Sequence, residues 1–168
     1  MFRISLICMT IYLTGCAAQL ESLNHSLNSL SEMSYSSSTR SNVDLSSKVV
    51  YPKNQELKNK IDSAMPFISD MLTGIACLEK GRLAQNNGAL RLYATADSYI
   101  NRFAAPADGM RYHDRSTCLD VIRIDGWRNS AVNSLKFSAT FRSESSGETG
   151  ARIFTIIKQP NGNWLARF

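Results

Sequence analysis

The sequence has few of the residues that build compact catalytic or metal sites. Its 168 residues include four cysteines and two histidines, and the cysteines lack the paired Cys-x-x-Cys spacing of a zinc site. Four cysteines are also too few for a scaffold held together by many disulfides. No Gly-x-Ser-x-Gly, His-Glu-x-x-His, Walker or Gly-x-Gly-x-x-Gly motif is present. We therefore expect a protein with no catalytic site, no metal ion and no cofactor.

Long apolar runs are lacking as well. A membrane-spanning helix needs roughly 20 apolar residues, whereas mean hydropathy is −0.19 and 43% of the residues are hydrophobic, both ordinary for a globular chain. The length allows one domain with a substantial core. Lys and Arg outnumber Asp and Glu by 19 to 14, which gives a formal net charge of +5.

The first 16 residues have the pattern of a secretory signal. Arg3 is their only charged residue, and an apolar run over Ile4–Leu13 follows it. The closing residues Leu13-Thr14-Gly15-Cys16 resemble the lipobox of bacterial lipoproteins. The resemblance implies cleavage before Cys16 and attachment of palmitate-type acyl chains to this residue, which would anchor the chain durably. By the same resemblance, Ala17 after the cysteine favours the outer membrane, with the domain facing the periplasm or the cell surface, because an Asp there is what commonly signals inner-membrane retention in Gram-negative lipoproteins.

A change of composition divides the mature chain. Residues 16–47 contain eleven serines and no Pro or Gly, which predicts a flexible tether. One feature opposes that interpretation, because four leucines repeat at the 3-4-3 spacing of a coiled coil and could support self-association. These leucines are Leu20, Leu23, Leu27 and Leu30.

Residues 48–168 read as a single globular α+β domain. Apolar residues at spacings of three and four predict a helix over 54–80, kinked at Pro66 or restarted there with Ser63 as cap, and a second helix over 89–104. Asn86-Asn87-Gly88 between them is typical of a turn. Alternation then predicts a curved antiparallel sheet of about four strands. The expected strands are 118–125, 134–142, 151–158 and 164–168.

This order of elements, with the ending Gly162-Asn163-Trp164, resembles the NTF2-like cone. That fold is common among small exported bacterial proteins and hosts both enzymes and binding modules. The resemblance is one of topology, so no functional residue is transferred from it.

Cys77 and Cys118 remain after the lipidated cysteine. In an oxidising compartment a disulfide between them is the favoured prediction, and the alternative is two buried free thiols.

The remaining site candidates are basic and aromatic. His113 lies in Arg111-Tyr112-His113-Asp114-Arg115, where a solvated loop is favoured over an acid–base pair. Export makes nucleic acid an improbable partner for the basic residues, which leaves an anionic envelope component, an acidic protein face or simply solvent. The candidate partner-binding residues are Arg111, Arg115, Arg123, Arg128, Lys136 and Arg142.

Two classes of function compete. The main hypothesis is a non-catalytic accessory lipoprotein that docks on an envelope assembly of the secretion, conjugation or pilus type. The alternative is a small NTF2-like enzyme or ligand-binding protein, which would need polar groups converging in one cavity, for instance Tyr99, His113 and Asp120.

Overall fold

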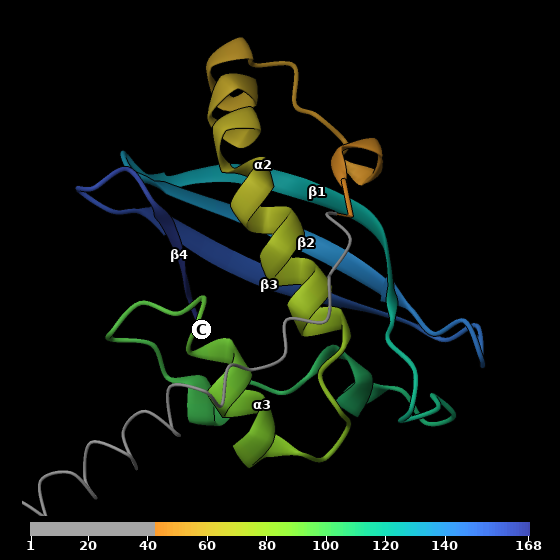
Figure 1. Cartoon of the computed structure of the whole chain (residues 1–168). Helices are drawn as coiled ribbons and strands as arrows, with labels where there is room; N and C mark the ends of the chain where they lie inside the picture. The colour runs from red at the N-terminus through yellow and green to blue at the C-terminus, as the bar shows by residue number, and fades with distance from the viewer. Residues whose placement is uncertain (1–42) are drawn as a thin grey trace, which may run out of the picture. The chain divides into compact units, whose positions relative to one another are not determined.

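Two helices and four strands follow one another in the computed structural model, which describes residues 43–168 (Figure 1). The expected signal, Cys16 and the leucine repeat lie outside the described residues. The helices and strands are α2 (Gln55–Ala76), α3 (Leu83–Leu90), β1 (Asp120–Ala131), β2 (Ser134–Arg142), β3 (Thr149–Lys158) and β4 (Trp164–Arg167). Three short 3₁₀ turns complete the order: η1 (Ser46–Lys48), η2 (Ile100–Arg102) and η3 (Pro106–Gly109).

The predicted apolar stripe of the first helix forms the buried side of α2. The Asn54 side chain accepts a hydrogen bond from the Leu57 backbone N–H at 2.8 Å and so caps the start of the helix. Pro66 lies inside one helical segment on its exposed side. Ser63 does not start a second helix, because α2 continues through it from Gln55 to Ala76. Its hydroxyl donates to the Lys60 carbonyl at 2.8 Å.

The second predicted helix, over 89–104, is wrong. Asn86-Asn87-Gly88 lies within α3, where the buried Asn86 amide donates to the Glu79 carbonyl at 2.8 Å. After α3 the chain leaves the helical conformation and pairs with the edge of the sheet. Leu92, which the helix would have buried, is 72% exposed.

The four strands form an antiparallel meander in the order β1-β2-β3-β4. The predicted bounds of β2 are confirmed, whereas β1 extends six residues beyond the expected end at residue 125. Register shifts in β1 place Val121, Ile124 and Trp127 on the core side at a spacing of three. Gly126 has a φ of +67° at the second shift, a conformation that glycine adopts without steric cost.

The core lies between α2 and one face of the sheet (Figure 1). Phe137 is 1% exposed at its centre, 4.9 Å from the Trp127 ring and 5.6 Å from the Phe154 ring, measured between centroids. The mixed α+β class with helices on a four-stranded antiparallel sheet is thus confirmed.

Short backbone pairings cover part of each edge of the sheet. The Val50 N–H donates to the Ile124 carbonyl at 2.8 Å on the β1 side. On the β4 side, Ala166 donates to the Tyr93 carbonyl at 2.7 Å and accepts from the Thr95 N–H at 2.8 Å. Covered edges limit unwanted pairing with other chains.

The predicted pair of cysteines is joined in the structure. The Sγ atoms of Cys77 and Cys118 are 2.05 Å apart, and their Cα atoms are 4.3 Å apart. A backbone hydrogen bond from Leu119 N–H to the Ala76 carbonyl, 2.9 Å long, lies next to the bond. The C-terminal end of α2 is therefore fixed to the start of β1.

The compact unit begins earlier than the expected boundary at residue 48. Its described part begins at residue 43, and Leu45 is 4% exposed within its core. The last residues assigned to the tether therefore belong to the folded unit, because Leu45 packs with the core.

Candidate functional site

The face of the sheet that points away from α2 is open, and we call it the open face. Strand register places the outward residues of β2 beside those of β3, with Ser138 opposite Ile153 and Lys136 opposite Thr155. Ile153 is 65% exposed there, although β3 is an interior strand paired on both sides. Its alternation with the buried Phe154 and Ile156 was the available signal for an outward position.

Two of the candidate arginines on the open face have carboxylate partners on β1. Arg123 Nε lies 2.5 Å from Asp125 Oδ2, and Arg142 Nη2 lies 3.2 Å from Asp120 Oδ2. These pairs lie on the exposed surface, where ion pairs contribute little to stability. They nevertheless neutralise each other, so these arginines are weaker sites for an outside anion.

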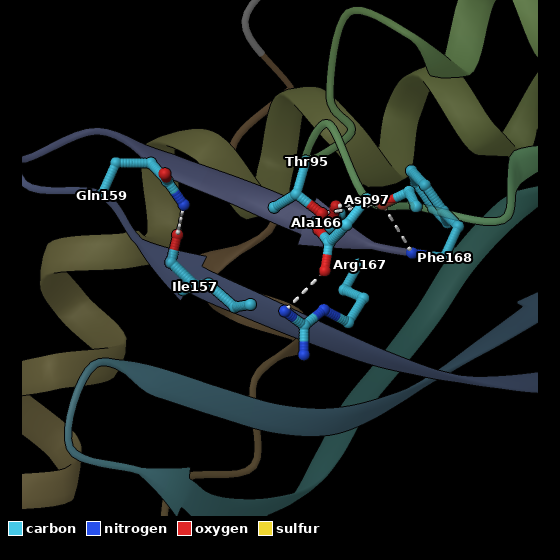
Figure 2. A network of polar contacts seen from close by, with 8 residues as sticks. Thr95, Asp97, Ile157, Gln159, Ala166, Arg167 and Phe168 are labelled. Carbon is cyan, nitrogen blue, oxygen red and sulfur yellow. Dashed lines mark hydrogen bonds and ion pairs between the residues drawn. The ribbon is translucent and has the colours of Figure 1, made fainter.

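Another arginine–aspartate pair lies on the opposite edge strand. Figure 2 shows Arg167 of β4 reaching Asp97, with Nη2 and Oδ2 2.9 Å apart. The same segment holds the end of the chain, since the Phe168 N–H donates to Ser98 Oγ at 3.3 Å. Sequence reasoning did not single out this arginine, because its partner lies 70 residues away.

Arg128 and Lys136 form the unusual pair of the open face. They lie directly opposite each other on β1 and β2, and both are exposed. Among residues 43–168, neither has a carboxylate within ion-pair distance. Like charges placed directly across a strand pair are destabilising. The fold thus tolerates a repulsion that an anion placed between the two cations would relieve.

The other two candidates, Arg111 and Arg115, lie in the loop before β1 rather than on the sheet. The Glu148 carboxylate accepts hydrogen bonds of 2.8 Å from the backbone N–H groups of both Arg111 and Tyr112. These bonds, with that of Tyr112 first, lower the pKa of Glu148. The contact fastens this loop to the turn between β2 and β3.

The prediction that His113 lies in a solvated loop is wrong. Its side chain is 8% exposed, and Nδ1 lies 3.0 Å from the hydroxyl of Ser143, which is fully buried. A histidine paired with a serine can activate a nucleophile, but here the serine hydroxyl is enclosed. The pair therefore has a structural role in joining the loop to the end of β2.

The polar groups proposed for a catalytic cavity have separate partners. His113 contacts Ser143, Asp120 pairs with Arg142, and Tyr99 is 73% exposed with the Arg102 guanidinium 5.7 Å from its ring centroid. Within the described residues, no cluster of three or more His, Cys, Asp or Glu side chains could hold a metal ion.

A groove of about 360 Å³ lies at the other end of β1. The segment before α2, the C-terminal end of α2, the disulfide and the first residues of β1 surround it. Both cysteines of the disulfide are exposed. Lys48 and Arg142 supply positive charge to its lining, and Asp120 supplies one negative charge.

Comparisons with protein-family models, with curated proteins and with solved structures each gave no match. In the part of the chain that the structure describes, no helix combines the length and the apolar character needed to cross a membrane.

Proposed function

We propose that this chain is a lipoprotein anchored to the outer membrane through Cys16, and that its folded unit is a non-catalytic contact module. The unit docks through its open face on an acidic surface of another envelope protein, as part of a secretion, conjugation or pilus assembly. Residues 17–42 link the anchor to the unit, and a flexible linker of this length would let the open face reach partners near the membrane.

The observation that carries this proposal is the combination of apolar and basic residues on the open face. Ile153, 65% exposed, lies between the half-buried neighbours Thr155 and Ser138, while Arg128 and Lys136 lie along the same face. An apolar centre beside charged groups is the usual composition of a protein contact surface. A partner carboxylate between the two cations would replace their repulsion by attraction.

The experiment uses a photo-crosslinking amino acid at position 153 of the full-length, lipidated chain in intact cells. We expect a defined crosslinked protein that is reduced about tenfold or more by Arg128→Glu combined with Lys136→Glu. The matched control is Lys53→Glu combined with Arg91→Glu, which changes net charge equally at exposed positions outside the strands. Among residues 43–168, neither side chain has a carboxylate at ion-pair distance. Crosslinking in the control should equal that of the parent chain.

A second readout separates a contact role from a structural one. Lys136→Thr removes the cross-strand repulsion, so it should raise the stability of the isolated protein by roughly 0.2–1 kcal/mol. The same substitution should weaken crosslinking. If Arg128 and Lys136 variants leave crosslinking unchanged, the open face is not the contact surface. If the purified chain instead binds protein-free anionic vesicles through these residues, the partner is lipid.

The NTF2-like ligand-binding or enzymatic alternative receives less support. Tyr99, His113 and Asp120 have different partners, so the arrangement offers no convergent polar group for it. A crosslink at position 153 that depends on Arg128 and Lys136 would favour the contact module over this alternative.

A further inference from the structure

The groove beside the disulfide is built by chain segments that diverge. Val50 is hydrogen-bonded to Ile124 of β1, but five residues earlier the Leu45 N–H donates to Ser69 Oγ of α2 at 3.4 Å. The η1 turn therefore carries the chain from the sheet edge to the helix. The disulfide closes the far side, because it joins Cys77 after α2 to Cys118 before β1.

The lining is part apolar and part polar, with cationic side chains at its border. Its apolar residues are Val43, Leu45, Ala76, Leu119, Val121 and Ile122. Arg142 and Asp120 neutralise each other at 3.2 Å. Lys48 is exposed, and within residues 43–168 it has no carboxylate at ion-pair distance. One positive charge thus remains without compensation beside the apolar part of the groove.

We infer that this groove binds a small amphipathic carboxylate, with its apolar body against the groove walls and its carboxylate on Lys48. The volume of about 360 Å³ lies at the small end of ligand pockets. At about 30 Å³ for each water-sized group, it accommodates roughly a dozen non-hydrogen atoms. An anion is favoured over a neutral molecule, because a Lys–carboxylate hydrogen bond is charge-assisted and so stronger than one to a neutral acceptor. This site goes beyond the proposed contact function and does not depend on it.

The disulfide provides a local reporter of occupancy. Both cysteines are exposed and line the groove, so a bound molecule would cover their sulfur atoms. Thiol–disulfide exchange requires access of the attacking thiolate to sulfur. A ligand in the groove should therefore slow reduction of the bond by dithiothreitol.

The experiment measures the reduction rate in the full-length chain carrying Cys16→Ser, so that no attached acyl chain competes. The probe is octanoate below its micelle concentration, detected by alkylation of released thiols and mass spectrometry. We expect saturable slowing by octanoate, and none by 1-octanol, which lacks the charge, or by acetate, which lacks the chain. Lys48→Gln should raise the half-saturating octanoate concentration about tenfold.

Two variants complete the test. Lys53→Gln removes an equal charge from an exposed position near η1 and should leave the octanoate effect unchanged. Thr73→Phe places a bulky ring in the groove lining and should abolish the effect, with a melting temperature close to that of the parent chain.

The inference is overturned by equal protection by 1-octanol, or by an octanoate effect that survives both Lys48→Gln and Thr73→Phe. Absence of any slowing by octanoate also overturns it. Failure here is distinguishable from failure of the contact proposal, because that test uses Arg128, Lys136 and position 153. Neither Lys48 nor Thr73 lies on the open face, so each site can fail alone.

Discussion

Removing the Cys77–Cys118 bond tests how far the junction between α2 and β1 supports the folded unit. The bond closes a loop with a sequence separation of 41 residues. In the chain-entropy model, a loop of this length stabilises the folded state by about 4 kcal/mol at 25 °C, because the cross-link limits the unfolded chain. That is a large part of the 5–15 kcal/mol typical of a domain.

Substitution of these two cysteines removes the cross-link and few other interactions. Both cysteines are exposed, so Cys→Ala at either position removes little packing. The hydrogen bond from Leu119 N–H to the Ala76 carbonyl is a backbone contact, so the substitutions do not remove either of its atoms. The loss of stability in Cys77→Ala/Cys118→Ala therefore reports mainly on the cross-link. For a unit of about 125 residues, 4 kcal/mol corresponds to a fall in melting temperature of about 15 °C.

The assay is urea unfolding of the full-length chain with Cys16→Ser as the parent. At slopes of 1–3 kcal/mol per molar, a loss of 4 kcal/mol lowers the midpoint by roughly 1.3–4 M. Each single substitution breaks the same bond, so single and double variants should agree within about 0.5 kcal/mol. A double variant within about 1 kcal/mol of the parent would refute the reasoning and indicate that the unfolded chain is already restricted in this region.

Four further predictions concern other parts of the chain. Mass spectrometry of the mature protein should find acyl groups on Cys16, and an unmodified N-terminus would contradict the anchor. Phe137→Ala should cost about 3–5 kcal/mol in a urea titration, because this core ring is 1% exposed. Lys60→Met should cost about 1–3 kcal/mol, since the Lys60 ammonium donates to three carbonyl oxygens at the turn between β1 and β2 that would lose their partner. The pKa of Glu148 is lower in the folded state, so its contribution to stability is present above the unfolded value of 4.5 and lost as pH falls through the folded pKa. The Tyr112 amide resonance should shift over that acid range, and Glu148→Gln should remove the transition.

The sequence predicted the parts of the fold whose pattern is contiguous. Buried residues of α2 recur every three or four positions, and those of β2 every second position, because each element packs one side on the same core. The cysteines were paired correctly because few alternatives remained once Cys16 was assigned to the lipid anchor. Local regularity and a small choice of partners were sufficient in these cases.

The segment 89–104 shows where periodicity fails. Its apolar residues have helical spacing, and Tyr93 and Ile100 are indeed buried. In the structure, however, the backbone of this segment pairs with the edge of β4 instead of forming a helix. The Tyr93 carbonyl and the Thr95 N–H bond to the N–H and carbonyl of Ala166. Which strand lies at the edge is determined only when the whole sheet has formed. The pairing of residues 93–95 with β4 therefore overrides local helix propensity, and the local sequence does not indicate it.

Sorting the basic residues required the register of the sheet. In the sequence, Arg123, Arg128, Lys136 and Arg142 are equivalent as cations beside apolar neighbours. Cross-strand pairing gives Arg142 the carboxylate of Asp120, whereas Arg128 faces Lys136. Three register shifts in β1 decide this outcome, because a shift of one residue would turn each side chain to the other face. Strand register therefore determines which basic side chains remain unpaired and can attract an outside partner, and the number of arginines in the sequence does not.

The groove was beyond sequence reasoning for a related physical cause. Its lining comes from residues 43–48, the end of α2, the start of β1 and the end of β2, which are separated by up to about a hundred positions. Lys48 had no distinguishing neighbour in the sequence. Its charge becomes significant because η1 places it beside apolar walls and because Arg142 already occupies the acidic group of the same groove. An uncompensated charge beside a partly apolar groove depends on how these four segments pack together, so a ligand site of this type can be argued only once their packing is known.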